Sequence, residues 1–316
     1  MKPIPTTSAS DPASAAGLAF RREADAWLEL PQARCGLWWS HVPSHPTERL
    51  GCIGAWQADD RREAALLLDA ACDALREAGA TLAVGPMDGN TWRSHRFVIE
   101  SDGRPPYFLE PTNPPEAPDD FRAAGFGELS RYSSSEIDLL APQPDFADTE
   151  ARLAREGVVL GPLRMDRFED ELRALHETSL VGFRNNFLYT DLAWEEFHAL
   201  YAAVESLLVP GLARMAWCGD VLAGFLFTLP DRLAPAGTAP AAILKSLTVR
   251  PEKRFAGLGS VLTKDCHLRA RELGFVKAIH ALQREGNTVL RLSERFGARV
   301  FRRYALFGKP LLHLPR

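Results

Sequence analysis

The chain has 316 residues, a formal net charge of −4 at pH 7 and 46% hydrophobic residues. This length favours two domains over one, and the apolar content is sufficient for a buried core. The negative charge argues against nucleic acid or an anionic membrane as a general partner. The five cysteines are scattered and form no C-x-x-C pair, which is typical of a reducing compartment, so a cytoplasmic location is expected. No apolar run reaches the roughly 20 residues needed to span a bilayer, so no membrane partner is expected.

The first half is predicted to begin with a disordered tail over residues 1–17, because Pro, Ser, Thr and Ala dominate there. A first αβ domain is expected over 18–140 and a Pro- and Asp-rich linker over 141–150. Hydrophobic periodicity and turn residues predict the elements of this domain. They are strands at 35–42, 50–56, 81–84 and 129–139, and helices at 59–79 and 119–125.

The second half, residues 151–316, has clearer patterns. Strands are predicted at 158–163, 213–217, 221–229, 243–249, 276–282 and 298–307. Helices are predicted at 168–180, 193–208, 257–274 and 287–296. The resulting order is β-α-α-β-β-β-α-β-α-β.

The stretch from Ile243 to Gly274 has the pattern of an anion site. An apolar strand is followed by a basic loop and then by a helix that begins near Gly257. The first amides of a helix lack intrahelical acceptors, and the helix dipole adds partial positive charge at that end. Gly257 and Gly259 carry no Cβ that would keep a phosphate away. The Gly-Lys-Ser/Thr of a P-loop and the third glycine of the dinucleotide fingerprint are both absent.

The remaining pattern is Arg254-Phe-Ala-Gly-Leu-Gly259, preceded by Val249-Arg-Pro251. It resembles motif A of the GNAT acyltransferase superfamily, and the order of predicted elements resembles the GNAT fold. The resemblance implies an α/β fold with a mixed sheet and acetyl-coenzyme A as co-substrate. It also implies that the strand before the loop splays and pairs with the pantetheine arm, while the loop holds the diphosphate. The coenzyme-binding residues implied in this way are Leu247, Thr248, Val249, Arg254, Phe255, Ala256, Gly257, Leu258, Gly259, Ser260 and Asn287. Asn287 is equally compatible with a helix N-cap.

The first half contains an echo of the second. Residues 79–91 and 274–288 both follow a predicted helix, pass through a strand and end in Gly-Asn-Thr. The first half is therefore interpreted as a degenerate GNAT-like domain, giving two such domains in tandem. A generic αβ unit with a similar turn is the alternative. Its helix follows Gln57-Ala-Asp-Asp-Arg-Arg62, and these acids would repel coenzyme A, so only the second half is expected to bind it.

The catalytic residues are harder to predict. GNAT enzymes often supply a tyrosine as the acid that protonates the leaving thiolate, and Ser293 stands at that position here. Tyr304 is the substitute candidate, with a buried core tyrosine as the alternative. His280 is a candidate base, although a histidine in an apolar strand is often a satisfied core residue. Glu177 and Asp231 are further unproven bases.

The expected function is acetyl-coenzyme A-dependent N-acetylation of a small molecule or peptide amine by direct attack. The alternative is a catalytically weak sensor or scaffold that binds acetyl-coenzyme A. Residues 183–191 and the interface between the halves are expected to form the acceptor pocket. No metal is expected, because prolines 43 and 46 break the helix that would align His41 with His45. The sequence identifies neither the acceptor nor the oligomeric state.

Overall fold

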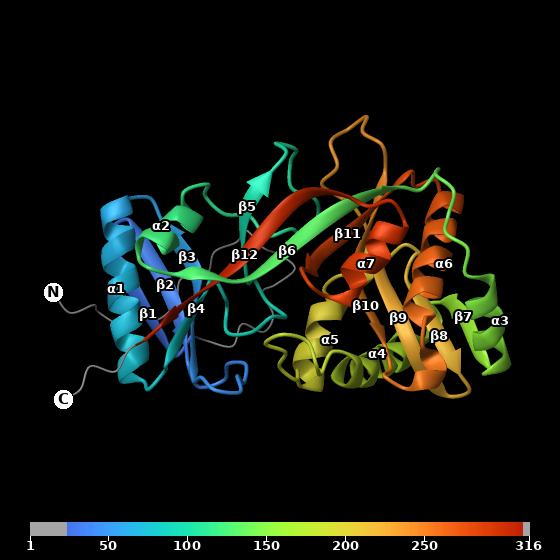
Figure 1. Ribbon diagram of the computed structural model, residues 1–316, viewed down its shortest axis with the longest axis horizontal. Helices are drawn as coiled ribbons and strands as arrows, with labels where there is room; N and C mark the ends of the chain where they lie inside the picture. The colour runs from blue at the N-terminus through green and yellow to red at the C-terminus, as the bar shows by residue number, and fades with distance from the viewer. Residues whose placement is uncertain (1–23, 312–316) are drawn as a thin grey trace.

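Residues 24–311 are described in the computed structural model, and their twelve strands form one continuous mixed sheet with helices on both faces (Figure 1). The predicted disordered tail lies outside the described residues. The strands are β1 (Ala26–Leu30), β2 (Ala33–Trp38), β3 (Leu50–Ala58), β4 (Leu82–Gly85), β5 (Phe97–Ser101), β6 (Gly127–Asp138), β7 (Val158–Pro162), β8 (Arg214–Cys218), β9 (Val221–Pro230), β10 (Ala241–Val249), β11 (Lys277–Arg284) and β12 (Arg299–Pro310). The α-helices are α1 (Arg61–Glu77), α2 (Ala117–Ala123), α3 (Ala147–Arg155), α4 (Phe168–Gly182), α5 (Trp194–Ala202), α6 (Leu258–Glu272) and α7 (Thr288–Arg295).

The second half has the predicted order of strands and α-helices from β7 to β12. Three elements were not predicted, namely β1, β5 and α3. The helix α3 begins at Ala147, inside the stretch that its prolines and aspartates marked as a linker. The domain boundaries themselves stay a prediction.

The order of strands across the sheet is nearly a palindrome, β1-β2-β3-β4-β12-β6-β11-β10-β9-β8-β7. The twelfth strand, β5, pairs with β12 outside this order. Reading inward from β1 and from β8, three antiparallel strands lead to one parallel pair, β3 with β4 in the first half and β10 with β11 in the second. The two halves therefore repeat one topology, as the prediction of tandem units requires. The extra strand β7 extends the second half alone.

At the centre of the palindrome the two halves exchange their last strands. The first half ends in β6, which pairs with β11 of the second half, while β12 pairs with β4 of the first. Between these contacts β6 and β12 pair with each other from Arg299–Glu136 to Gly308–Gly127, and Figure 1 shows them running together across the middle of the molecule. The sequence patterns did not predict this exchange, because they do not specify which strands pair.

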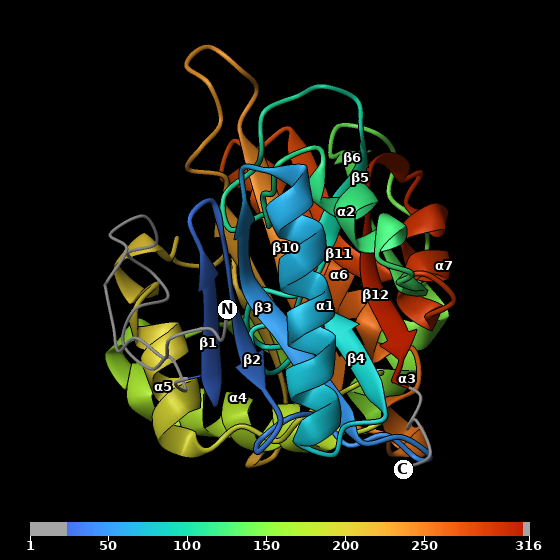
Figure 2. The same cartoon turned by 90° about the vertical axis from the view of Figure 1, so that its left-hand side faces the viewer.

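One face of the first half is covered by α1, as Figure 2 shows from the end of the molecule. The helix buries one apolar face, which consists of Ala64, Leu67, Leu68, Ala71, Cys72 and Leu75. Asp60 is its N-cap, and one carboxylate oxygen accepts the amides of Arg62 and Glu63, each at 2.9 Å. A cap of this kind contributes about 1 kcal/mol to stability.

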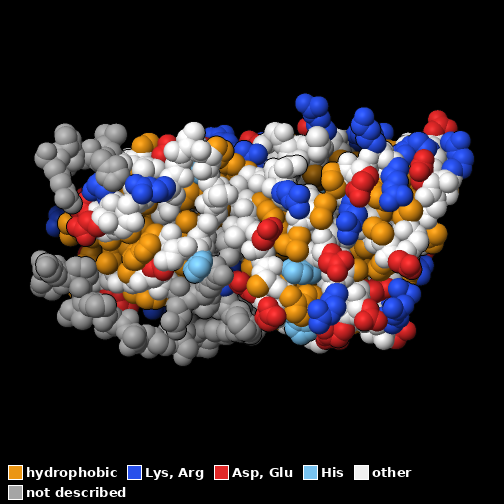
Figure 3. All heavy atoms as spheres, turned by 90° about the horizontal axis from the view of Figure 1, so that it is seen from below, with side chains coloured by type: hydrophobic (Ala, Val, Ile, Leu, Met, Phe, Trp, Pro, Cys, Tyr) orange, Lys and Arg blue, Asp and Glu red, His pale blue; other side chains and the backbone are white. Residues whose placement is uncertain are grey.

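The sheet of the second half is covered on both faces. The core on one face joins residues of α3, α6 and α7, and the core on the other joins residues of α4 and α5. Seen from below, this half carries acidic and basic side chains interspersed over its surface (Figure 3). No helix within residues 24–311 combines the length and the apolar character needed to cross a membrane.

A buried polar cluster ties the loop before α2 to β12. The guanidinium of Arg302 lies 2.8 Å from the carboxylate of Glu110, and both side chains are almost fully buried. The hydroxyl of Tyr304 also donates to Glu110 and lies 3.0 Å from Ser134 Oγ. Removing one partner of such a buried pair would leave the other charge uncompensated, at a cost of about 3–5 kcal/mol.

The exchange of β6 and β12 predicts that neither half folds alone. Fragments 1–140 and 141–316, each produced separately, should show no cooperative unfolding transition by circular dichroism, because each lacks the strand that completes its sheet. Mixing the fragments should restore the transition. A cooperative transition in the isolated second fragment would contradict this dependence.

Candidate functional site

A gap opens between β10 and β11 where their parallel pairing stops. The two strands pair only from Ala241–Lys277 to Leu244–His280, although β10 continues to Val249. A bulge at Lys245 separates the paired part of β10 from the splayed part. The splay that the family resemblance implied is therefore present.

The open edge of β10 has main-chain groups without a strand partner. The amide of Arg250 points toward β9, where it donates to the carbonyl of Ala223 at 2.8 Å. Main-chain groups alternate along a strand, so those of Leu247 and Val249 point the other way, into the gap. The gap can therefore accept an extended ligand as an added strand would be accepted.

The helix α6 begins where the anion-site pattern predicts. Its N-cap is Gly257, whose φ of +81° is in the left-handed region that favours glycine. The amides of Phe255 and Ala256 already donate to carbonyls of the preceding turn, and that of Ser260 to Gly257. From Phe255 to Ser260, the amides that have no acceptor are therefore those of Gly257, Leu258 and Gly259. The diphosphate was predicted to bind the main-chain amides of Phe255 to Ser260. Three of these six amides are therefore free to donate to it.

The loop is held from its outer side by α3. The guanidinium of Arg152 donates to the carbonyl of Arg254 at 2.7 Å and also to that of Ala256. Turning these carbonyls outward leaves the amides at the start of α6 on the side of the gap. The unpredicted helix α3 thus helps to orient the loop.

A cavity of about 420 Å³ lies at this end of the gap. It is lined by seven of the predicted coenzyme-binding residues, Leu247, Thr248, Val249, Gly257, Gly259, Ser260 and Asn287. Gly182, at the end of α4, is a further lining residue that the sequence did not indicate. A Cβ on Gly182 would overlap the hydroxyl of Thr248, so only glycine lets α4 approach β10 so closely.

The other predicted coenzyme-binding residues lie away from this cavity. The side chains of Phe255 and Leu258 are buried in the core beneath α6, and Arg254 and Ala256 are exposed. Arg254 stacks on the ring of Phe255, 4.5 Å from its centroid. Asn287 is the N-cap of α7, as predicted, but its side chain makes no capping hydrogen bond.

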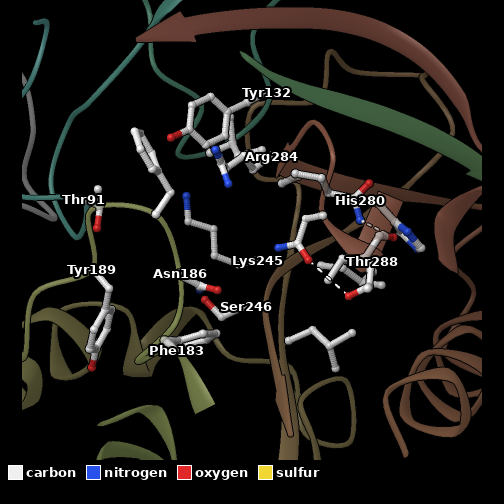
Figure 4. Close-up of a pocket in the computed structure, with 18 of the residues that line it drawn as sticks. Thr91, Tyr132, Phe183, Asn186, Tyr189, Lys245, Ser246, His280, Arg284 and Thr288 are labelled. Atoms are coloured by element: carbon white, nitrogen blue, oxygen red, sulfur yellow. Dashed lines mark hydrogen bonds between the residues drawn. The ribbon is translucent and has the colours of Figure 1, made fainter. Parts of the chain in front are cut away.

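A second cavity, of about 580 Å³, adjoins the first and lies between the two halves. Leu247, Asn287 and Thr288 line both cavities. The larger cavity is lined by residues of the 183–191 segment, as expected for the acceptor pocket. These residues are Phe183, Asn185, Asn186, Phe187 and Tyr189, of which Figure 4 labels three.

The first half contributes the opposite wall through residues 91–96 and Tyr132. Trp92 donates from its indole to the carbonyl of Thr190 at 2.8 Å and packs edge-on against Phe183. Arg93 forms a largely buried ion pair with Glu196 of α5. These contacts fix the first half against the 183–196 region, so the degenerate half supplies structure to the cavity.

The equivalent gap in the first half is filled by its own chain. The strands β3 and β4 pair only from Leu50–Leu82 to Cys52–Val84, and residues 86–88 then dock on β3. The amide of Met87 donates to the carbonyl of Ile53 at 2.8 Å, and the carboxylate of Asp88 accepts the amide of Ala55 at 2.6 Å. The start of α1 is likewise occupied by the carboxylate of Asp60.

His280 borders the larger cavity, but both of its ring nitrogens are hydrogen-bonded within the protein. Nε2 lies 2.9 Å from Nε2 of His267, and Nδ1 lies 2.6 Å from the hydroxyl of Ser293. Burial lowers the pKa of His280 well below its usual value, and the neighbouring His267 lowers it further. Burial also lowers the pKa of His267 to about 3. Both histidines are therefore neutral at physiological pH.

Ser293 and Tyr304 do not line either cavity. Ser293 is buried and exchanges hydrogen bonds with the amide of Gln283 at 2.7 and 3.0 Å. Tyr304 is fully buried in the cluster around Glu110, and burial, followed by neighbouring Tyr107 and Glu110, raises the pKa of its hydroxyl. Glu177 is exposed on α4, and Asp231 accepts the amide of Phe108 at 2.9 Å. Neither carboxylate lines either cavity.

Lys245 is a site residue that the sequence interpretation missed. It interrupts the apolar run of β10, occupies the bulge, and extends into the larger cavity toward Tyr132 (Figure 4). Its ammonium group donates to the carbonyl of Leu109 at 3.4 Å. Burial, and then the nearby Arg96, lower the pKa of Lys245 to about 8. The signal in the sequence was a single charge inside an apolar strand.

Backbone strain is concentrated around this cavity. Of the described residues other than glycine, five have φ in the left-handed region, Ala55, Arg96, Leu109, Leu188 and Leu282. Arg96 and Leu282 line the cavity, Leu109 accepts the hydrogen bond from Lys245, and Leu188 accepts one from Thr91 at 3.3 Å. Each such residue costs on the order of 1–3 kcal/mol, and strain of this kind is typical of functional sites.

Lys245 predicts a measurable instability of the ligand-free protein. Its pKa is about 8 when folded and 10.5 in its ordinary state, so the unfolded chain binds this proton more tightly. The resulting penalty on folding is fully present below pH 8 and is relieved as the pH rises from about 8 to about 10.5. Lys245→Met should therefore raise the free energy of unfolding by at least about 1 kcal/mol near pH 7, and by less near pH 10.

Urea denaturation at the two pH values measures this difference. Lys277→Met is the matched control, because Lys277 is paired with Glu136 at 3.0 Å and its removal should not stabilise the protein. Destabilisation by Lys245→Met near pH 7 would contradict the interpretation.

No protein-family model matches the sequence, and no curated protein matches it. Solved structures do match. A GCN5-related glucosamine N-acetyltransferase region of a fungal multi-domain GH3 β-N-acetylglucosaminidase aligns with a TM-score of 0.55 and 15% identity over 88% of this chain. The chain spans only 31% of that fungal protein.

Two further solved structures match over most of both chains. A GCN5-related N-acetyltransferase from Sphaerobacter thermophilus aligns with a TM-score of 0.52 and 15% identity, covering 89% of this chain and 78% of that one. A tandem GNAT protein from the clavulanic acid biosynthesis pathway aligns with a TM-score of 0.51 and 13% identity, covering 90% and 80%. At these identities the likeness concerns the fold, and it confirms the prediction that this chain has the GNAT fold in a tandem arrangement.

Proposed function

We propose that the second half transfers an acetyl group from acetyl-coenzyme A to the amine of a small molecule or peptide. The observation that carries the proposal is the open gap between β10 and β11, which ends at the unpaired amides of Gly257, Leu258 and Gly259. An extended amide-bearing chain that ends in a diphosphate has the chemistry to occupy both features.

The residues at the gap fit acetyl-coenzyme A. Leu247 and Val249 would pair with the pantetheine amides, and the start of α6 would hold the diphosphate. A Cβ on Gly182 would overlap the hydroxyl of Thr248 at the edge of this cavity, so glycine is required at this position. The thioester would then lie where the smaller cavity meets the larger one, near Leu247 and Asn287.

The chain's own groups would assist the transfer by orientation and polarisation. In the reaction the neutral amine nitrogen forms a bond to the acyl carbon and the bond from that carbon to sulfur breaks. Coenzyme A leaves as a thiolate, which takes up the proton that the amine loses and becomes the free thiol. An amide of the open edge of β10 would polarise the acyl oxygen. The amine must arrive without its extra proton, and no Asp or Glu among the described residues that line the larger cavity would stabilise its ammonium form.

Tyr304, Ser293 and His280 stay untested as acid or base. The hydroxyl of Tyr304 and the ring nitrogens of His280 already have partners inside the protein. This observation favours the second candidate function, a binding module that holds acetyl-coenzyme A with little turnover. Release of coenzyme A over a panel of amines separates the two, because only the enzyme shows release that depends on the amine.

A variant at the start of α6 tests the site. Ser260→Glu should weaken acetyl-coenzyme A binding at least about tenfold, because it places a carboxylate beside the diphosphate. Glutamate in the first turn of a helix favours the helix dipole, so the loss would not reflect unfolding. Isothermal titration calorimetry measures the affinity.

Ser260→Gln is the matched control for this variant and should bind within about threefold of the wild type. Gly257→Glu is a poorer test, because φ at Gly257 is positive and a Cβ there would lie 2.8 Å from Thr149. Equal affinities for wild type and Ser260→Glu would refute the assignment.

The two halves also predict the stoichiometry of binding. Because residues 86–88 and Asp60 fill the equivalent positions in the first half, one acetyl-coenzyme A should bind per chain. Calorimetric titration of the full chain gives this number directly. A value of two would contradict the proposed division between the halves.

A further inference from the structure

The wall of the larger cavity carries an excess of positive charge. Lys245, Arg96 and Arg284 line it, and no Asp or Glu is found among its described lining residues. Since the chain as a whole has a net charge of −4, this excess is local.

Arg96 is held with its guanidinium in a fixed position. It donates to the carbonyl of His95 at 2.7 Å and to that of Leu282 at 3.1 Å, and it lies over the ring of Tyr132, 4.1 Å from the centroid. His95 also accepts from Arg96 through its ring, which is neutral because burial, and then Arg96, lower its pKa. All these partners are uncharged, so they orient the guanidinium and leave its charge uncompensated.

Lys245 is in the same situation. Its hydrogen-bond partner is a carbonyl, and no ion pair to it is found within residues 24–311. Glu110 is the carboxylate that contributes to its electrostatic environment, but that carboxylate is already bonded to Arg302 and Tyr304. Uncompensated buried cations are costly, and proteins keep them where a ligand supplies the counter-charge.

We propose that the acceptor amine carries a carboxylate, which Arg96 and Lys245 bind, and an apolar body, which packs on the aromatic wall of Trp92, Phe183, Phe187 and Tyr189. An aromatic α-amino acid is the simplest molecule with these three parts. This inference rests on the proposed acetyl transfer, because it names the acceptor class of the same site. Arg96 and Lys245 are thereby assigned to specificity.

The same arrangement of charges would also keep the amine reactive. With the carboxylate paired to both cations, the α-amine lies in a site that contains no acidic side chain. Nothing in the lining then stabilises its ammonium form, and the neutral nucleophile is favoured.

The test compares matched acceptors on the full chain with saturating acetyl-coenzyme A. The acceptors are L-phenylalanine and L-phenylalaninamide, which differ in the carboxylate, with phosphoethanolamine and ethanolamine as a phosphate-bearing pair. The wild type should prefer phenylalanine over its amide by at least about tenfold in kcat/KM. Lys245→Met should remove most of this preference by lowering the value for phenylalanine, and that for the amide should stay within about threefold.

Controls separate specificity from folding. Lys277→Met should keep the full preference, and both variants should bind acetyl-coenzyme A as the wild type does. Arg96→Gln should act in the same direction as Lys245→Met. If the phosphate-bearing pair shows the larger preference, or the amide is preferred, or Lys245→Met affects both phenylalanine compounds equally, the carboxylate assignment is overturned.

A binding measurement keeps the inference distinct from the proposed activity. 3-Phenylpropanoate has the carboxylate and the aromatic body but no amine, so it should stabilise the wild type in thermal unfolding and stabilise Lys245→Met much less. Its neutral amide should stabilise neither. Absence of coenzyme A release with every amine would sink the proposed transfer, whereas release that prefers neutral amines would sink only the carboxylate assignment.

Discussion

The antiparallel pairing of β6 with β12 is the interaction on which the rest of the structure depends. Each strand belongs by sequence to one half and completes the sheet of the other. The pairing sets the distance and orientation between the halves, and so brings residues 91–96 opposite the gap between β10 and β11. The larger cavity exists only because of this arrangement, since one wall comes from each half.

The gap between β3 and β4 is filled by the chain itself, whereas the equivalent gap between β10 and β11 is open, and few residues account for this difference. Both have a parallel pair of strands that diverges, followed in space by the start of a helix. In the first half, Met87 and Asp88 dock on the diverging strand and Asp60 caps the helix. In the second half, the edge of β10 that faces the gap has no strand partner beyond Leu244 within the described residues, and the amides of Gly257, Leu258 and Gly259 have no acceptor. A few residues therefore decide whether the same topology leaves this gap open or fills it with its own chain.

Local patterns made much of the fold predictable. The order of the second half and the start of α6 at Gly257 follow from periodicity and glycine placement, and the splay of β10 was implied by the family resemblance of the motif around Arg254. The exchange of strands was not predictable, because a local sequence pattern can indicate a strand but not its partner. The short strands β1 and β5 carry too few residues for a clear pattern, and α3 was hidden by prolines and aspartates next to it.

The candidate site was predictable where a motif specifies main-chain geometry and not where side chains from distant segments meet. Seven of the predicted coenzyme-binding residues line the smaller cavity, whereas the side chains of Phe255 and Leu258 turn into the core. Tyr304 is near Ser293 in the sequence, where the family resemblance implies a tyrosine, but its hydroxyl donates to Glu110 in the core. Lys245 could have been noticed as a charge in an apolar strand, although its neighbour Arg96 lies far away in the sequence.

The exchanged strands also constrain how such a chain can change over generations. A deletion that removed the first half would remove β6 with it and leave β11 beside an incomplete sheet. Selection for a folded second half therefore also preserves the first half, which supplies β6, even though the gap between β3 and β4 is filled by residues 86–88. Because each half depends on a strand of the other, the strand exchange prevents the gene from evolving to a single-domain length.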